Sequence, residues 1–314
     1  IEYFAFGKSY AHPPKRPSFL DPNEESGTRV GPWTGEQYPQ LAAMLEDYQE
    51  GMEELLEIAK IEKCRFPIPR DPDATVSPDH VIPCVTRWVF LSTRGLNLDL
   101  GEGRFQEAVN KYVCLARIAD HFRQQSALYY HNVGFYLEWV FPHGVKSFVV
   151  TGDVTNEQLS TLRSIMQPTQ DTWSDDYKRL KKVEDLLDRK RWRQIDMVTK
   201  LKGLIERSIP QDGLSQDAFE RAETIYYRQL VDRRGRYILI ALRQYKNETG
   251  SWPESLEAIR ASLHEEMLTD PQNGGTFLYE LTDEGFRLMS TGRNGIDDGG
   301  DYKEGDDWPI WPTQ

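Results

Sequence analysis

Hydrophobic residues recur at helical spacing along most of the first 250 positions of the chain. After Thr34, apolar residues follow one another at steps of three or four, at Leu41, Leu45, Tyr48, Met52, Leu55 and Ala59. Such spacing places them on one face of a helix, and Thr34 with Gln37 has the capping-box pattern that begins one. Comparable stripes, joined by short connections, predict about seven helices packed as a bundle with antiparallel neighbours.

The middle of the chain alternates helical stripes with proline-rich interruptions. Four prolines make residues 64–79 a loop, and Pro83 then fits the first turn of a helix that ends at Leu96. The next helix begins at Gly103, and the hairpin of the two resembles a single tetratricopeptide unit. No recurrence at the family's period of about 34 residues accompanies it, so a solenoid is not expected.

The later helices differ in their polarity. Residues 126–150 are the most apolar and predict a central buried helix that ends or kinks near Pro142. Residues 172–207 mix both charges and predict a solvent-facing helix. The basic run inside it, 178–193, contains interleaved carboxylates, which favours a solvated helix face over a nucleic-acid surface. Residues 215–247 predict another long helix.

The two ends of the chain lack helical periodicity. Residues 1–32 are rich in Pro, Gly and aromatic residues and predict an extended N-terminal arm. Near the other end, the strand-like runs Phe277–Leu281 and Phe286–Ser290 flank a turn, so they predict a β-hairpin. The sequence therefore predicts a mainly α protein with three parts: the arm at 1–32, a helical bundle at 33–250 and a small α+β segment at 251–314.

Composition and charge narrow the class of protein. Lys and Arg number 38 against 50 Asp and Glu, a net charge of −12, which argues against nucleic acid as a partner. No apolar run reaches the roughly 18–20 residues that span a bilayer. Because the sequence begins at Ile1, we expect a signal peptide or membrane anchor to have preceded it.

Three cysteines bear on the compartment. Cys64 and Cys84 lie in proline-rich surroundings where they could pair, and such a bridge would stabilise the fold by about 3 kcal/mol. The alternative is two unpaired thiols. Cys114 falls within a helical apolar stripe and is expected to be a buried thiol.

A glycine-rich acidic loop near the C-terminus is the clearest candidate site. Calcium prefers about six to eight oxygen ligands in flexible geometry, and glycines let a loop curl around it. The spacing is not that of an EF-hand, and the alternative is a solvated acidic tail. The candidate calcium ligands are Asn294, Asp297, Asp298, Asp301, Asp306 and Asp307.

Evidence for catalysis is sparse. The chain has no nucleophile elbow, phosphate loop, dinucleotide fingerprint or paired histidine metal motif. His131 and Glu138 lie two turns apart in the apolar helix and could share a face as an acid–base pair. The alternative is a satisfied polar contact within the core. We therefore expect neither catalytic residues nor a bound organic cofactor.

The C-terminal segment resembles the globular end of the major pseudopilins of type II secretion. The likeness rests on Asp270–Gly274 with Tyr279, on Ser290–Gly295 and on the acidic loop Asp297–Asp307, although Asn294 replaces that family's coordinating aspartate. The chain is also similar to a group of uncharacterised exported or membrane-anchored bacterial proteins. That likeness rests on four stretches: Cys64–Pro67, Arg104–His121, Gly250–Leu256 and Ser290–Gly300. Both resemblances imply an extracytoplasmic location, periplasmic or in the cell envelope.

These observations together predict a non-enzymatic structural or binding protein of the bacterial cell envelope, with calcium stabilising its C-terminal loop and a protein or peptide as its partner. Two other functions stay open. One is an enzyme that uses carboxylates such as Glu138 in a cleft of the bundle. The other is a tetratricopeptide-like adaptor that binds a peptide in an apolar groove.

Overall fold

The computed structural model describes residues 2–10, 17–66, 78–167, 169–188, 218–299 and 306–312. The chain divides into two compact units. The first comprises Ile1–Val145 and Asp175–Gly203, and the second comprises Lys146–Ser174 and Leu204–Gln314. The predicted fold class is confirmed, because the described chain is mainly helical and carries a small antiparallel sheet near its C-terminus.

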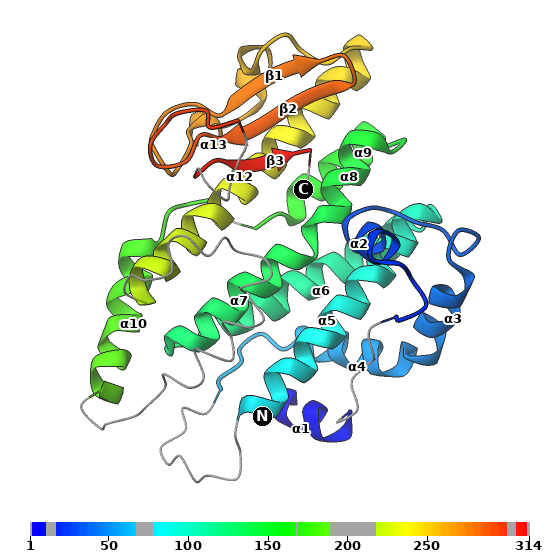
Figure 1. Ribbon diagram of the computed structural model, residues 1–314, viewed down its shortest axis with the longest axis vertical. Coiled ribbons are helices and arrows are strands. Elements are labelled where there is room, and N and C mark those ends of the chain that lie inside the picture. The colour runs from blue at the N-terminus through cyan, green and yellow to red at the C-terminus, as the bar shows by residue number, and fades with distance from the viewer. Residues whose placement is uncertain are drawn as a thin grey trace. The chain divides into compact units, whose positions relative to one another are not determined.

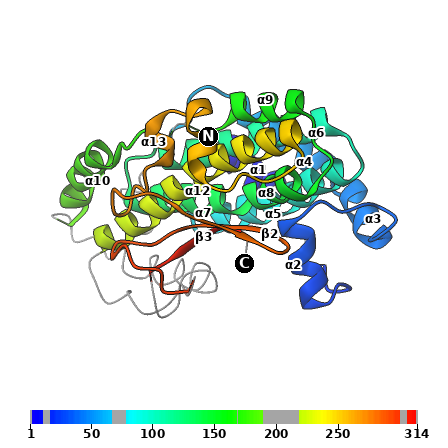
Figure 2. The same ribbon diagram turned by 90° about the horizontal axis from the view of Figure 1, so that it is seen from above.

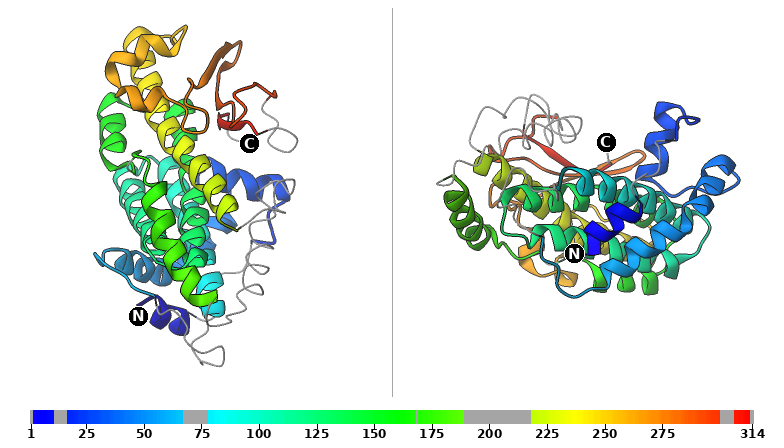
Figure 3. Two further views of the ribbon diagram at one scale, coloured as in Figure 1. Left: turned by 90° about the vertical axis from the view of Figure 1, so that its left-hand side faces the viewer. Right: turned by 90° about the horizontal axis from the view of Figure 1, so that it is seen from below.

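The first unit is built around three long helices that pack side by side, with α6 between α5 and α7 (Figures 1 and 3). Gly134 lets α7 approach α6 closely, since a Cβ at this position would lie 2.5 Å from the backbone nitrogen of Arg123. The helices of this unit are α1 (Glu2–Ser9), α2 (Pro22–Val30), α3 (Pro39–Asp47), α4 (Gln49–Ala59), α5 (Pro78–Gly101), α6 (Phe105–Arg123) and α7 (Leu128–Val140). Two more, α8 (Pro142–Thr151) and α10 (Trp173–Asp188), contribute residues to both units.

The prediction of an extended N-terminal arm was wrong. Tyr3 and Phe6, one helical turn apart on α1, are both fully buried, and the Tyr3 hydroxyl is 2.9 Å from Nδ1 of His121. Asp21 begins α2 with a complete capping box, in which Glu24 returns the hydrogen bond. Each helix spans about two turns, too short for a periodic stripe to be visible in the sequence.

Local sequence signals predict some of the helix breaks but not all of them. The predicted break near Pro142 is confirmed, since α7 ends at Val140 and α8 begins at Pro142. The long helix predicted after Thr34 is divided at Tyr48 into α3 and α4. Thr34 and Gln37 do form the reciprocal bonds of a capping box, although α3 begins only at Pro39.

The Cys64–Cys84 bridge does not form, and no disulfide occurs in the described part of the chain. The Cys84 thiol donates to the carbonyl oxygen of Tyr10 over 3.2 Å. Burial raises the pKa of the Cys84 and Cys114 thiols, which keeps both in the protonated, unreactive form at neutral pH.

The second unit places a three-stranded antiparallel sheet against one long helix (Figure 2). The predicted hairpin is confirmed, with Thr282 opposite Gly285 at its turn. Its third strand, which pairs with β2, was not predicted. The elements are α9 (Asn156–Ile165), α12 (Ala218–Thr249), the 3-10 helix η2 (Leu256–Ser262), α13 (Glu265–Leu268), β1 (Leu278–Thr282), β2 (Gly285–Ser290) and β3 (Trp308–Trp311).

Helix α12 contacts the other elements of the second unit through close packing and through buried charged side chains. Gly235 allows β3 to approach, because a Cβ there would lie 2.6 Å from the side chain of Ile310. On the same helix Arg234 donates to the carbonyl of Thr269 and to Glu266, each over 2.8 Å, and Arg236 donates to Gln167. These bonds pair part of each buried guanidinium group, and they hold α13 and the chain just after α9 onto α12.

Candidate metal centre

The acidic loop begins where β2 ends, and its first turn requires glycine. Gly292 has a φ of +63°, a left-handed conformation that glycine adopts without the cost of a Cβ. A Cβ at Gly292 would also overlap the carboxyl group of Asp306. The turn therefore brings the start of the loop directly against Asp306, two residues before β3.

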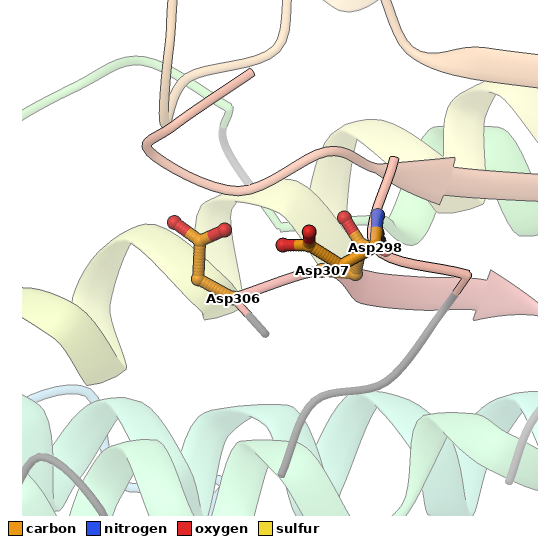
Figure 4. Close-up of side chains that lie close together, drawn as sticks. All are labelled: Asp298, Asp306 and Asp307. Carbon is orange, nitrogen blue, oxygen red and sulfur yellow. Dashed lines mark hydrogen bonds between the residues drawn. The ribbon is translucent and has the colours of Figure 1, made fainter. Parts of the chain in front are cut away.

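Three aspartates converge at this place (Figure 4). Asp298 comes from the loop after β2, whereas Asp306 and Asp307 lead into β3. One carboxylate oxygen of each lies within 4.8 Å of the others. Asp307 is completely buried, Asp306 is half-buried and Asp298 is exposed. Like charges this close repel one another. A bound cation would offset this repulsion, because it would attract each of the three carboxylates.

Backbone amides orient two of the three carboxylates. Asp306 Oδ2 accepts hydrogen bonds from the backbone nitrogens of Arg293 and Asn294, at 2.6 and 3.2 Å. Asp307 Oδ2 accepts from the backbone nitrogen of Asp298 at 2.8 Å. These bonds tie the two ends of the loop together.

The structure separates the six predicted ligands. Asp298, Asp306 and Asp307 are brought together, and Asn294 joins them indirectly, donating from Nδ2 to Asp298 over 3.0 Å. Asp297 turns away and forms an ion pair with Arg287 at 2.8 Å. Asp301 lies outside the described residues.

A supporting segment, Asp270 to Asn273, was not predicted to belong to the site. Asn273 Nδ2 donates to the carbonyl of Gly292 over 2.7 Å, and buried Asp270 accepts from the backbone nitrogen of Gln272 over 2.9 Å. Gln272 in turn donates to the hydroxyl of Ser290. The Asp-Pro and Ser-Thr-Gly stretches of the sequence therefore lock together, which holds the beginning of the acidic loop in place.

The donor set fits a hard divalent cation. Oδ1 of Asp306 is buried and has no hydrogen-bond partner among the described residues, so its charge is uncompensated by any donor there. Arg228 is the nearby counter-charge: burial lowers its pKa, and the attraction of Asp306 opposes that effect. Its guanidinium lies over the Trp308 ring, 4.8 Å from the ring centre. Arg228 therefore offsets part of the negative charge of Asp306.

Gly292 offers a test of this geometry. Gly292→Ala should destabilise the second unit by roughly 1–3 kcal/mol, since it combines a left-handed φ with overlap against Asp306. Gly295→Ala is the matched control: its φ is +69°, but nothing lies within 4 Å of an added Cβ. Urea denaturation should show the larger loss for Gly292→Ala, and equal losses would contradict the packed turn.

The second candidate pair, His131 and Glu138, lies in the core of the first unit. The two side chains are 0% and 1% exposed. His131 Nδ1 donates to the carbonyl of Arg123 over 2.6 Å, and an Arg123 guanidinium nitrogen lies 3.9 Å from the Glu138 carboxylate. Arg123 thus links the pair in a buried polar contact, inaccessible to a solvent-borne substrate in this structure.

Comparison with protein-family models, curated proteins and solved structures found no match to this chain. Among the described helices, none has both the length and the apolar character needed to cross a membrane.

Proposed function

We propose that the chain is a non-enzymatic binding or structural protein of the bacterial cell envelope, and that its C-terminal loop folds around a calcium ion. The observation that supports a cation site is the convergence of Asp298, Asp306 and Asp307. The likeness of the same segment to pseudopilins supports the extracytoplasmic location. In that compartment a calcium-held loop would keep β3 paired to the sheet and so maintain the surface that a partner recognises.

Calcium suits this loop better than magnesium. Magnesium demands near-ideal octahedral geometry, whereas calcium accepts irregular sets of carboxylate and carbonyl oxygens. The loop supplies carboxylates of unequal exposure on a backbone with positive φ at Gly292, Gly295 and Gly299.

The thermal stability of the protein should depend on calcium. A ligand that binds only the folded form stabilises it by about 2.7 kcal/mol at one hundred times its Kd. Melting in excess calcium should therefore occur at a higher temperature than in EDTA. Asp307→Asn should abolish the difference, because it removes charge from the most buried carboxylate of the cluster. Asp283→Asn, in the exposed turn between β1 and β2, is the control and should retain it.

Equal melting temperatures with saturating calcium and with EDTA would remove calcium from the proposal. The binding role has a separate test in affinity purification from a bacterial envelope fraction. A partner recovered by the wild-type protein and lost with Asp307→Asn would support a calcium-held binding surface. Equal recovery by both would show that the cluster does not shape that surface.

A further inference from the structure

A pocket separate from the aspartate cluster lies within the second unit. It is open to solvent, has a volume of about 510 Å³, and is formed by the end of α8, the last turns of α12, the β1–β2 turn and β3. This volume falls in the range of small-molecule sites. Two tryptophans and four charged residues line it: Trp252, Trp311, Arg243, Lys246, Asp153 and Glu284.

The two cations of the pocket retain binding capacity. Arg243 donates from Nε to Asn247 over 2.8 Å and from Nη1 to the carbonyl of Val150 over 3.0 Å. Its Nη2 has no hydrogen-bond partner in the part of the chain that the structure describes. The Lys246 ammonium lies 4.4 Å from the centre of the Trp252 ring and forms no ion pair with a described residue. Both groups can therefore donate to a ligand.

The charges of the lining discriminate between ligand classes. An anionic ligand attracted by Arg243 and Lys246 would also face the carboxylates of Asp153 and Glu284. A cationic ligand would meet the reverse problem, and the place over Trp252 that would favour it is already taken by Lys246. The balance of two positive and two negative side chains favours a ligand without net charge.

A neutral saccharide matches this lining. Each sugar hydroxyl both donates and accepts hydrogen bonds, so it can use cationic donors and carboxylate acceptors in the same pocket. The C–H face of a pyranose ring carries partial positive charge, which suits the negative face of an indole ring. Trp311 supplies such a ring, and Glu284 lies on the turn beside it in the same lining.

We propose that this pocket binds a neutral saccharide, with Trp311 as the stacking surface, Arg243 and Lys246 as donors and Glu284 as an acceptor. The proposal goes beyond the calcium-held loop and uses none of the three clustered aspartates. In this proposal the pocket recognises a glycan, a ligand that is distinct from the calcium ion.

Isothermal titration calorimetry of the full chain tests the proposal. The probes are maltotriose, cellotriose and chitotriose as neutral saccharides, with citrate and choline as charged ligands. At least one trisaccharide should bind at one site per chain. Glu284→Gln should weaken that binding roughly tenfold, as expected for loss of a charged hydrogen-bond acceptor. The neighbouring Asp283→Asn, outside the pocket lining, should leave the affinity unchanged.

Three outcomes would overturn the proposal: no binding to any saccharide on a broad glycan array, binding of citrate or choline with no saccharide bound, or unaltered saccharide affinity in both Glu284→Gln and Lys246→Met. The titrations are repeated with the Asp307→Asn protein, so that loss of calcium and loss of saccharide are read separately. If the protein binds a saccharide but its melting temperature does not depend on calcium, the saccharide proposal stands and the proposal of a calcium-held loop is wrong.

Discussion

Replacing Lys146 by methionine should destabilise the protein by about 3–5 kcal/mol, because it leaves the Asp232 carboxylate buried without its partner. Both residues belong to the second unit, where Lys146 Nζ lies 3.2 Å from Asp232 Oδ1 and the side chains are only 2% and 6% exposed. Burial lowers the pKa of Lys146, and the attraction of Asp232 opposes this shift. The pair is therefore held together against a large cost of desolvation.

An exposed ion pair gives the matched comparison. Lys178 and Asp175 lie 3.5 Å apart with side chains 72% and 88% exposed. Lys178→Met should change the free energy of unfolding by less than about 1 kcal/mol, since water screens such pairs. The double variant Lys146→Met with Asp232→Leu should recover part of the loss. Urea denaturation measures all three, and similar effects of Lys146→Met and Lys178→Met would contradict the buried pair.

The second large effect concerns pH. Burial lowers the pKa of His131 from 6.5 to about 4, and the backbone bond to Arg123 and the charge of Asp176 only partly oppose this, while Arg179 and Arg123 add to it. The unfolded state therefore binds a proton that the folded state refuses between those two values. The contribution of neutral His131 to the free energy of unfolding is fully present above about pH 6.5. It is lost as the pH falls towards 4, which lowers that free energy by roughly 3 kcal/mol.

The variant His131→Asn isolates this contribution. Asparagine keeps an N–H donor near the position of Nδ1, which donates to the Arg123 carbonyl, but it does not titrate. At neutral pH the variant should be less stable than the wild type. Between pH 6.5 and 4 its free energy of unfolding should fall by roughly 3 kcal/mol less than that of the wild type. His264→Asn, at an exposed position, should keep the wild-type slope. Parallel pH curves for wild type and His131→Asn would contradict a neutral, buried imidazole.

Much of the fold could be predicted because its signals are local. The strand-like runs at 277–281 and 286–290, on either side of a turn, predict the hairpin, and Pro142 predicts a break that the structure confirms. Strand β3 escaped prediction because it has four residues and contains Pro309, and its pairing with β2 depends on residues about twenty positions away. The buried charges of α12 escaped for a related reason. Arg234 and Arg236 would ordinarily indicate solvent, and only their distant partners make burial tolerable.

The candidate site shows the same limit. Composition predicts an acidic, glycine-rich loop, but it cannot separate Asp297 from Asp298. The structure separates them because Arg287, ten positions earlier on β2, draws Asp297 away, whereas the Asp298 backbone is bound to Asp307. Asn273, which supports the loop through Gly292, lies nearly twenty positions before it. Long-range contacts, which a local pattern does not contain, select the converging set.

Calorimetric titration of the EDTA-treated protein with calcium tests the central claim most directly. Wild-type protein should bind calcium at one site per chain. Asp298→Asn and Asp307→Asn should each weaken or abolish that binding, whereas Asp297→Asn, whose carboxylate pairs with Arg287, should bind with nearly wild-type affinity. Absence of calcium binding by the wild-type protein, or a loss as large in Asp297→Asn as in Asp307→Asn, would contradict a site built from Asp298, Asp306 and Asp307.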